Sequence, residues 1–196
     1  MTMDGALARV IRTAADRAAV AEEERCELCA AHVPGEHPHL YDTDAAEVRC
    51  VCRACSVLFA DDGAGRYRLV PRRRVRLPAV DTALLGVPVG LVFFVPRGDG
   101  TVTAQGPSPA GAMRWEVDAA AWQRMVATCP QLASVAPDVE ALLVNTVRGL
   151  DEHWIVPVDD CYRMVALVRR EWRGLSGGGR VWPAVERFFA ELTERP

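Results

Sequence analysis

The sequence predicts an α+β protein, in which a small four-cysteine metal-binding module precedes a larger α+β domain. Three observations support this fold class: two C-x2-C pairs early in the chain, β-branched and aromatic runs in the middle, and two amphipathic helical patterns at the end. We expect an N-terminal helix over residues 1–24, and the module with an arginine-rich linker over 25–77. A domain with a mostly antiparallel sheet and a C-terminal helical pair should occupy 78–196.

The composition argues against binding to nucleic acid or to membranes. The 196 residues are half hydrophobic and carry a net charge of −3, which gives no general attraction to nucleic acid or to anionic membranes. We expect neither a signal peptide nor a membrane-spanning helix, because the sequence has no apolar run of suitable length. A cytoplasmic location follows as an expectation. In that reducing compartment, the seven cysteines favour metal binding over disulfides.

The first segment, residues 4–24, has the spacing of an amphipathic helix. Asp4 is its expected N-cap, and the apolar positions at helical intervals are Leu7, Val10, Ile11, Ala14, Ala15 and Ala18. Alanine buries little area, so this helix has a weak apolar face. Packing within the chain and docking to a partner are both consistent with it.

The four cysteines of the C-x2-C pairs are the strongest chemical signal. Each short turn presents two sulfurs, and together the pairs supply the ligands of one tetrahedral ion: Cys26, Cys29, Cys52 and Cys55. Four thiolates fill all four coordination positions of the ion, which is typical of structural zinc sites of the zinc-ribbon or knuckle kind. Iron in a rubredoxin-like site is the alternative, although rubredoxin-type turns usually have glycine where this chain has Ala30 and Ser56.

The chain between the pairs should return to deliver the second one. Pro34-Gly35 indicates a turn, and residues 40–48 fit a short hairpin. After the second pair, we expect an apolar patch beneath the metal from Val57, Leu58 and Phe59.

A fifth cysteine and three histidines lie in the same segment. Because residues i and i+2 of a strand share a side, Cys50 should lie near the site. It is expected there as a thiol packed beside the ligands, as a substitute ligand, or as a sign of an iron–sulfur cluster. His32, His37 and His39 loosely resemble the histidines of HNH nucleases. The Asn and second His that such nucleases place after the second pair are missing, so we interpret these histidines as solvated or hydrogen-bonded loop residues.

The stretch Arg66–Arg76 carries six arginines. The alternation of arginines with apolar residues suits a strand that exposes one face to solvent and leads into a linker. The arginines are also candidate docking charges for an acidic protein partner. Nucleic-acid binding is the third interpretation, disfavoured by the net negative charge and by the lack of interleaved aromatic residues.

The remaining chain alternates strand and helix patterns. We predict a hairpin over residues 87–95 and 101–104, an irregular loop over 106–111, and a third strand over 115–117. A helix capped by Asp118 should follow, then strands over 139–147 and 153–156, a helix over 160–173 capped by Asp159, and a final helix over 181–192.

The glycine-rich stretch Gly174–Arg180 contains the pattern G-x-S-x-G. A nucleophile elbow requires a strand before the serine, whereas a helix is predicted here, so a serine hydrolase is excluded. The stretch is either a helix–helix connection or an anion-binding turn. The sequence offers no other catalytic constellation, and we therefore expect a protein that is not an enzyme.

Several runs carry a family resemblance: CELC, CVCRAC-x-x-LF, PSPAGA, EALLVN, PVDDCYRMVALVRREWRGLSGG and W-x-x-x-x-RFFAEL. They resemble a bacterial family of unknown function whose genes lie beside those of actinobacterial-type [NiFe]-hydrogenases. The resemblance implies an accessory, assembly or electron-handling role, with hydrogenase subunits or maturation factors as partners. It supplies no catalytic residue.

These observations lead to a prediction of a non-catalytic, zinc-binding accessory or assembly protein that acts through protein–protein contacts. The alternatives are a rubredoxin-like electron carrier and a nucleic-acid-binding zinc module.

Overall fold

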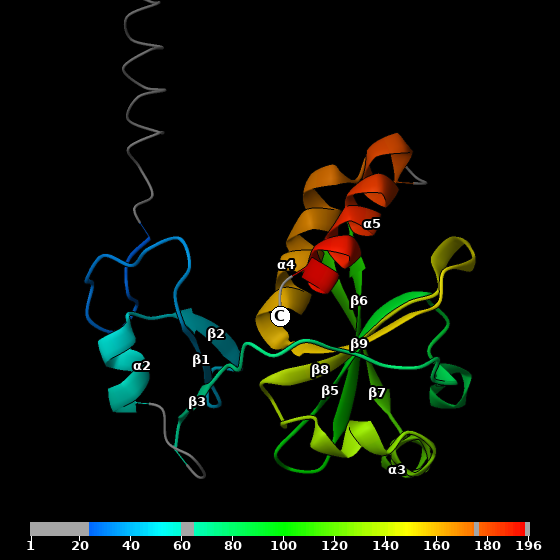
Figure 1. Cartoon of the computed structure of the whole chain (residues 1–196), viewed down its shortest axis with the longest axis horizontal. Helices are drawn as coiled ribbons and strands as arrows, with labels where there is room; N and C mark the ends of the chain where they lie inside the picture. The colour runs from blue at the N-terminus through cyan, green and yellow to red at the C-terminus, as the bar shows by residue number, and fades with distance from the viewer. Residues whose placement is uncertain (1–23, 60–64, 175–176, 195–196) are drawn as a thin grey trace, which may run out of the picture. The chain divides into compact units, whose positions relative to one another are not determined.

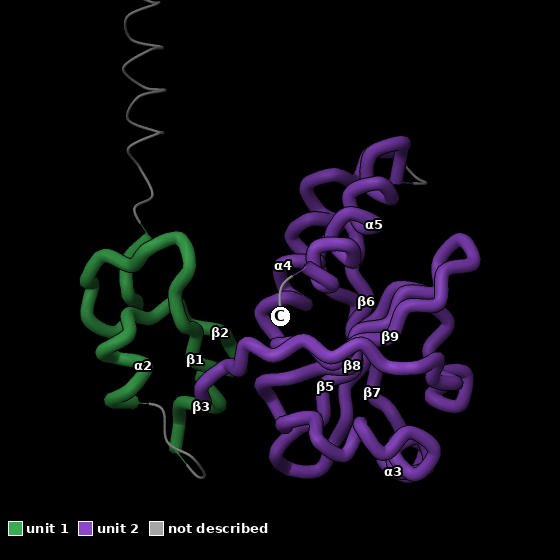
Figure 2. Tube along the Cα trace, viewed as in Figure 1, with its two compact units in different colours: residues 1–68 green, residues 69–196 purple. Residues whose placement is uncertain are grey.

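The computed structural model describes residues 24–59, 65–174 and 177–194 (Figure 1). The chain divides into two compact units, Met1–Arg68 and Leu69–Pro196 (Figure 2). The predicted N-terminal helix, with its Asp4 cap, lies outside the described residues. The mixed α and β content, the antiparallel sheets and the C-terminal helical pair confirm the predicted fold class.

The first unit is built on a three-stranded sheet with the order β2-β1-β3. Its strands are β1 (His39–Asp42), β2 (Glu47–Cys50) and β3 (Tyr67–Leu69), and the helix α2 (Arg53–Phe59) follows β2. β1 and β2 form the expected antiparallel hairpin, in which His39 pairs with Cys50 and Asp42 pairs with Glu47. This hairpin brings the second cysteine pair back to the first.

The small core of the first unit consists of buried side chains around two of the cysteines: Cys26, Val33, Leu40, Val51 and Cys55. The prediction that Val57, Leu58 and Phe59 fill this place is wrong. Their exposed fractions are 73%, 75% and 47%. The reason is that α2 buries only Cys55 and Ser56, so its last turn faces solvent.

The second unit contains a six-stranded antiparallel sheet with the order β4-β9-β8-β5-β6-β7. Its strands are β4 (Val75–Arg76), β5 (Leu91–Pro96), β6 (Val102–Ser108), β7 (Gly111–Val117), β8 (Glu140–Asn145) and β9 (Glu152–Pro157). β4 lies inside the stretch that we expected to be a linker, and it pairs with β9 at the edge of the sheet.

The predicted irregular loop over residues 106–111 is also wrong, because β6 and β7 continue into it and pair as far as Ser108 and Gly111. A glycine fits at 106 because the indole of Trp115 lies against it, 3.1 Å from where a Cβ would stand. Pro107 is tolerated because the pairing of β6 with β5 ends earlier, at Gln105.

Helices cover both faces of the large sheet (Figure 1). Successive strand residues point to opposite faces, and on β5 the ring of Phe93 contacts Tyr162 of α4 (Val158–Glu171), whereas Phe94 contacts Trp122 of α3 (Ala119–Thr128). α5 (Gly178–Glu194) packs on α4 and completes the helical pair. The Asp118 cap of α3 is confirmed, since its carboxylate accepts from the N–H of Ala120.

Three short 3-10 helices connect these elements: η1 (Thr82–Leu85), η2 (Pro130–Ser134) and η3 (Val147–Gly149). α4 begins two residues earlier than predicted, so the N-cap is Pro157 and the predicted cap at Asp159 is wrong, because Asp159 lies within the first turn. Among the residues that the structure describes, none of the helices combines the length and the apolar character needed to cross a lipid bilayer.

Candidate metal centre

Two short turns present the four cysteines. In the first, the N–H of Ala30 donates to the carbonyl of Cys26 at 2.7 Å, and Ala30 adopts the left-handed φ of 59° that closes the turn. In the second, Cys52 precedes α2: its Sγ accepts from the N–H of Cys55 at 3.4 Å, and its carbonyl accepts from the N–H of Ser56 at 2.9 Å. The backbone of each turn thus directs its two sulfurs toward one common centre.

Glu27 holds the two turns together. Its backbone N–H donates to the carbonyl of Cys50 at 2.9 Å, and its Oε1 accepts from the N–H of Cys50 at 2.7 Å. Its other oxygen, Oε2, accepts from the guanidinium of Arg49 at 3.1 Å. The first turn is therefore fastened to the strand that leads into the second.

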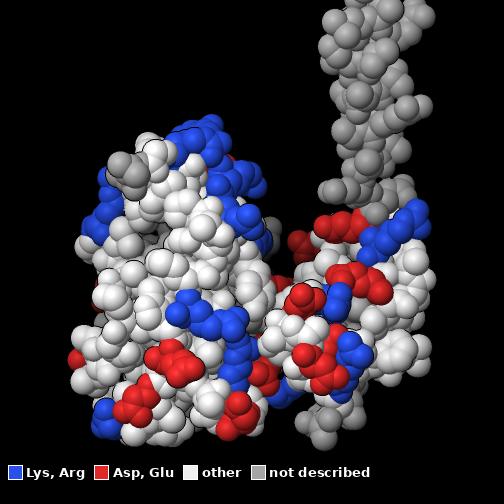
Figure 3. Space-filling view, turned by 180° about the vertical axis from the view of Figure 1, so that it is seen from behind, with Lys and Arg blue, Asp and Glu red and all other residues white. Residues whose placement is uncertain are grey.

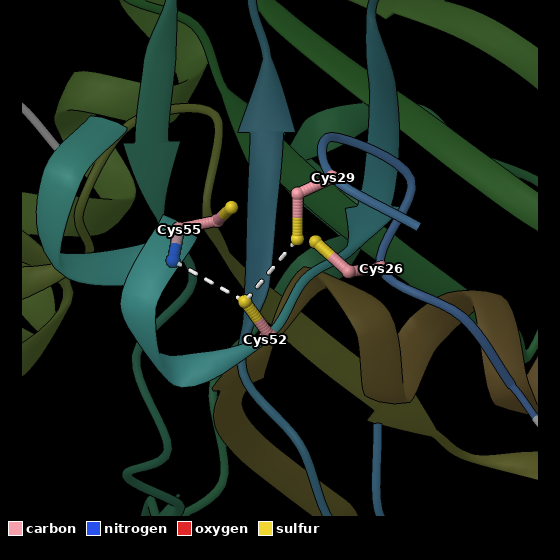
Figure 4. Close-up of side chains that lie close together, drawn as sticks. All are labelled: Cys26, Cys29, Cys52 and Cys55. Carbon is pink, nitrogen blue, oxygen red and sulfur yellow. Dashed lines mark hydrogen bonds between the residues drawn. The ribbon is translucent and has the colours of Figure 1, made fainter. Parts of the chain in front are cut away.

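The four sulfurs converge (Figure 4). All lie within 4.8 Å of one another, and the Sγ atoms of Cys29 and Cys52 are 3.7 Å apart. A tetrahedral zinc with Zn–S bonds of about 2.3 Å requires sulfurs separated by about 3.8 Å. The cysteines are free thiols. The donor set and its spacing fit one tetrahedral ion, as the sequence predicted for Cys26, Cys29, Cys52 and Cys55.

Electrostatics at the cluster also favour a cation. Burial raises the pKa of the Cys26 thiol, but hydrogen bonds from backbone N–H groups of both turns outweigh this effect and lower the pKa to about 6. Burial, together with hydrogen bonds among the thiols, raises the pKa of Cys55 to about 12. The Cys26 thiolate therefore forms more easily than the Cys55 thiolate, which burial and the neighbouring thiols disfavour. A divalent ion would stabilise the thiolate form of both.

Comparison with protein families matches residues 25–196 to a family of unknown function, DUF5947. The chain belongs to this family. Comparison with curated proteins and with solved structures gives no match. The DUF5947 match includes all four clustered cysteines and the whole second unit, and it begins next to Cys26.

Cys50 of this DUF5947 chain is not one of the four clustered thiols. Its thiol forms a group with His37 and His39, in which the ligand atoms lie within 4.8 Å of one another, rather than with the four thiols. The group does not support Cys50 as a substitute ligand of the first cluster, and its place as a thiol packed beside that cluster stays a prediction. The interpretation of His37 and His39 as loop residues missed this group, which an His-x-His pattern opposite a strand cysteine could have indicated. His32 is exposed and lies in an isolated bridge with Arg25.

The arginines of the stretch Arg66–Arg76 are largely engaged within the chain. Arg73 forms hydrogen bonds to both carboxylate oxygens of Glu140, at 2.6 and 2.7 Å, and Arg74 pairs with Asp160 at 2.6 Å. Figure 3 shows basic and acidic side chains close together on the face that it draws. Charges used in this way are poor candidates for tracking a phosphate backbone.

The glycine-rich stretch follows α4, so the helix that argued against a nucleophile elbow is confirmed. Gly177 and Gly178 have φ angles of +88° and +68°, and α5 begins at Gly178. Arg180 lies 3.8 Å from Glu171 of α4. This ion pair joins the two helices across their connection.

Proposed function

We propose that Cys26, Cys29, Cys52 and Cys55 hold one structural Zn2+, and that the protein is a non-catalytic accessory or assembly factor of a [NiFe]-hydrogenase system. The observation that carries the metal site is the convergence of four free thiols at tetrahedral spacing. Four thiolates complete the coordination of zinc and leave no position for a substrate, which is the arrangement of structural sites.

A structural ion suits the first unit because its core is small. Its five-residue cluster of buried side chains includes two of the cysteines themselves, Cys26 and Cys55. Metal binding to small modules of this kind supplies about 10–16 kcal/mol of apparent folding free energy. Bound Zn2+ would cross-link the two turns and hold the module in one shape.

The surface next to the second turn supports a role in protein contacts. Val57, Leu58 and Phe59 form three consecutive exposed apolar positions at the end of α2. Contiguous exposed apolar side chains mark interaction surfaces in folded proteins. The metal would fix the orientation of this patch, because α2 begins at the residue after Cys52.

The hydrogenase context rests on the gene neighbourhood implied by the family resemblance, which is an associational argument. It makes hydrogenase subunits and maturation factors the proposed partners. A reducing, cytoplasmic location is proposed with them, since the site requires free thiols.

A rubredoxin-like iron site is the second candidate. Cys29 is exposed and Cys52 is partly exposed, so two of the four sulfurs lie at the surface, where an electron could enter or leave. Iron accepts the same four thiolates. The identity of the ion therefore separates a structural role from electron transfer.

The test is the metal content and colour of the full chain purified aerobically from its native source. A colourless protein with zinc bound to the four thiols is expected, whereas a red ferric thiolate would establish the iron alternative. Cys29→Ser and Cys52→Ser should each release this metal, and Cys129→Ser, a free thiol of the second unit, should retain it. Retention of all bound metal by the first two variants would refute the site.

The partner proposal is tested by co-purification with hydrogenase subunits. Leu58→Asp should keep the zinc and lose the hydrogenase proteins, because it places a charge in the apolar patch without touching the thiols. Ala31→Asp, at another exposed position of the unit, is the matched control. Equal recovery with Leu58→Asp, or no hydrogenase protein with the wild type, would contradict the proposal.

A further inference from the structure

A second group of metal-ligating side chains lies in the first unit, formed by His37, His39 and Cys50. Strand register creates it. His39 of β1 is the direct cross-strand partner of Cys50 of β2, and side chains opposite each other on an antiparallel pair share a face at about 4.5–5.5 Å. The ring of His37, two residues before His39, lies edge-on to the His39 ring with the centroids 4.7 Å apart.

The hydrogen bonds of His37 determine which of its nitrogens is available. Nδ1 lies 2.8 Å from the carbonyl oxygen of Pro34, which only accepts, so Nδ1 carries the proton. The carboxylate of Glu24 lies 3.4 Å from the same nitrogen. Histidines that bind metals are oriented in this way, with the other ring N–H given to a carbonyl or a carboxylate.

The remaining nitrogen of His37, Nε2, is buried and has no hydrogen-bond partner among the described residues. The side chain is only 4% exposed. Buried polar atoms are nearly always paired, since leaving one unpaired costs its full desolvation penalty. When Nδ1 donates to Pro34, a neutral His37 ring directs the lone pair of Nε2 into this buried position, as a metal-binding histidine does.

We propose that His37 Nε2, a ring nitrogen of His39 and the sulfur of Cys50 form a second metal site, distinct from the four-thiol cluster. Two imidazoles and one thiolate suit a borderline divalent cation such as Zn2+. The site does not depend on which metal the four thiols hold.

Three protein ligands leave the fourth position of a tetrahedral ion open. His39 and Cys50 are half-buried, so this position is accessible to water or to a donor group from an incoming molecule. Zinc sites with three protein ligands are those that exchange ligands, in contrast to closed four-thiolate sites. The two clusters of this unit thus have different roles: the first holds the shape, and the second binds an ion that remains reachable.

The experiment is a zinc titration of the full chain, followed by native mass spectrometry, with Co2+ as a spectroscopic substitute. The wild type should bind two ions per chain. The double variant His37→Ala/His39→Ala should bind one and keep the thiolate spectrum of the first cluster, whereas His32→Ala, an exposed histidine of the same segment, should bind two. Cys50→Ser should remove the thiolate-to-cobalt band of the second ion only.

Retention of the first ion shows that a variant is folded. If the double-histidine variant does not fold, the imidazole nitrogen signals of the wild type decide the question: both histidines should shift as the second equivalent of Zn2+ is added. Binding of one ion by the wild type, unchanged imidazole signals, or a second ion that survives loss of both histidines would overturn the proposal. Loss of the first ion alone, in Cys29→Ser, bears only on the proposed function.

Discussion

Arg66 forms a two-point ion pair with the buried carboxylate of Asp42, and so fastens the start of β3 to the end of β1. Its Nε lies 3.0 Å from Oδ1 and its Nη2 lies 2.8 Å from Oδ2. The same carboxylate accepts from the N–H groups of Asp44 and Ala45, both at 3.2 Å, and closes the hairpin turn. One carboxylate therefore stabilises both the turn and the packing of the third strand.

The first prediction concerns the protonation of Asp42. The hydrogen bond from Arg66 outweighs the opposing effect of burial and lowers the pKa of this carboxyl from 3.8 to about 2. Because the folded-state pKa lies below the ordinary value, the pair contributes stability above about pH 4, and this contribution is lost as the pH falls toward 2. At pH 4 the Asp42 carboxyl signal in NMR spectra of the wild type should remain that of a carboxylate.

Arg66→Gln should raise the pKa of Asp42, so that its carboxyl is partly protonated at pH 4. The matched control is Arg72→Gln, at an exposed arginine of the second unit, which should leave the signal unchanged. A partly protonated Asp42 in the wild type at this pH would contradict the structure.

The second prediction concerns the pair of Arg73 with Glu140. Glu140 is 1% exposed, and Arg73 contacts both of its oxygens. Arg73→Met should lower the free energy of unfolding of the second unit by about 2 kcal/mol, because it leaves the buried Glu140 carboxylate without its cationic partner. The loss stays moderate because Arg73 itself is half-exposed. All five tryptophans lie in this unit, so their fluorescence during denaturation in urea measures it alone.

A double-mutant cycle isolates this interaction. Glu140→Gln removes the charge but keeps an acceptor for the N–H of Ala136, which donates to Glu140 at 2.8 Å. The double variant should lose less than the sum of the single losses. Arg124→Met, at an exposed arginine of α3, should change stability by less than about 0.5 kcal/mol. Additive losses would show that the two side chains do not interact.

Most of the fold could be predicted because its signals are local. The apolar run around Phe93 and Phe94 indicated a strand buried on both faces, Asp118 indicated a helix start, and the spacing of Cys26 to Cys55 indicated four converging sulfurs. Each signal depends on neighbouring residues and on the period of the element, which the sequence contains directly.

The missed features depend on contacts between distant segments. Val57 and Leu58 had the apolar character of core residues, but Val33, Leu40 and Val51, from other elements, already fill the core. The meeting of His39 and Cys50 depends on the register of a hairpin, and a shift of one residue would have placed their side chains on opposite faces.

The third prediction concerns removal of metal from the full chain by a chelator. The first unit has a small core, so its backbone amides over residues 26–59 should lose protection from hydrogen exchange, whereas β5 and β8 of the second unit should keep theirs. Tryptophan fluorescence should not change. Loss of protection in both units together would show that they unfold as one, and unchanged protection in the first would show that no metal stabilises it.

The fourth prediction concerns Ala30, whose left-handed φ of 59° closes the first cysteine turn. This conformation costs a residue with a Cβ about 1–2 kcal/mol through steric clash. Glycine adopts it without a clash, and its only cost is the larger conformational entropy of the unfolded chain. Ala30→Gly should therefore stabilise the metal-bound turn by about 1 kcal/mol, which corresponds to about fivefold tighter metal binding in competition with a chelator. Ala31→Gly is the matched control, because Ala31 is the next residue, is also exposed and has no positive φ. It should weaken binding slightly through added freedom of the unfolded chain. Weaker metal binding by Ala30→Gly would mean that the turn does not close through a left-handed residue, and the alignment of the Cys26 and Cys29 sulfurs would then need another cause.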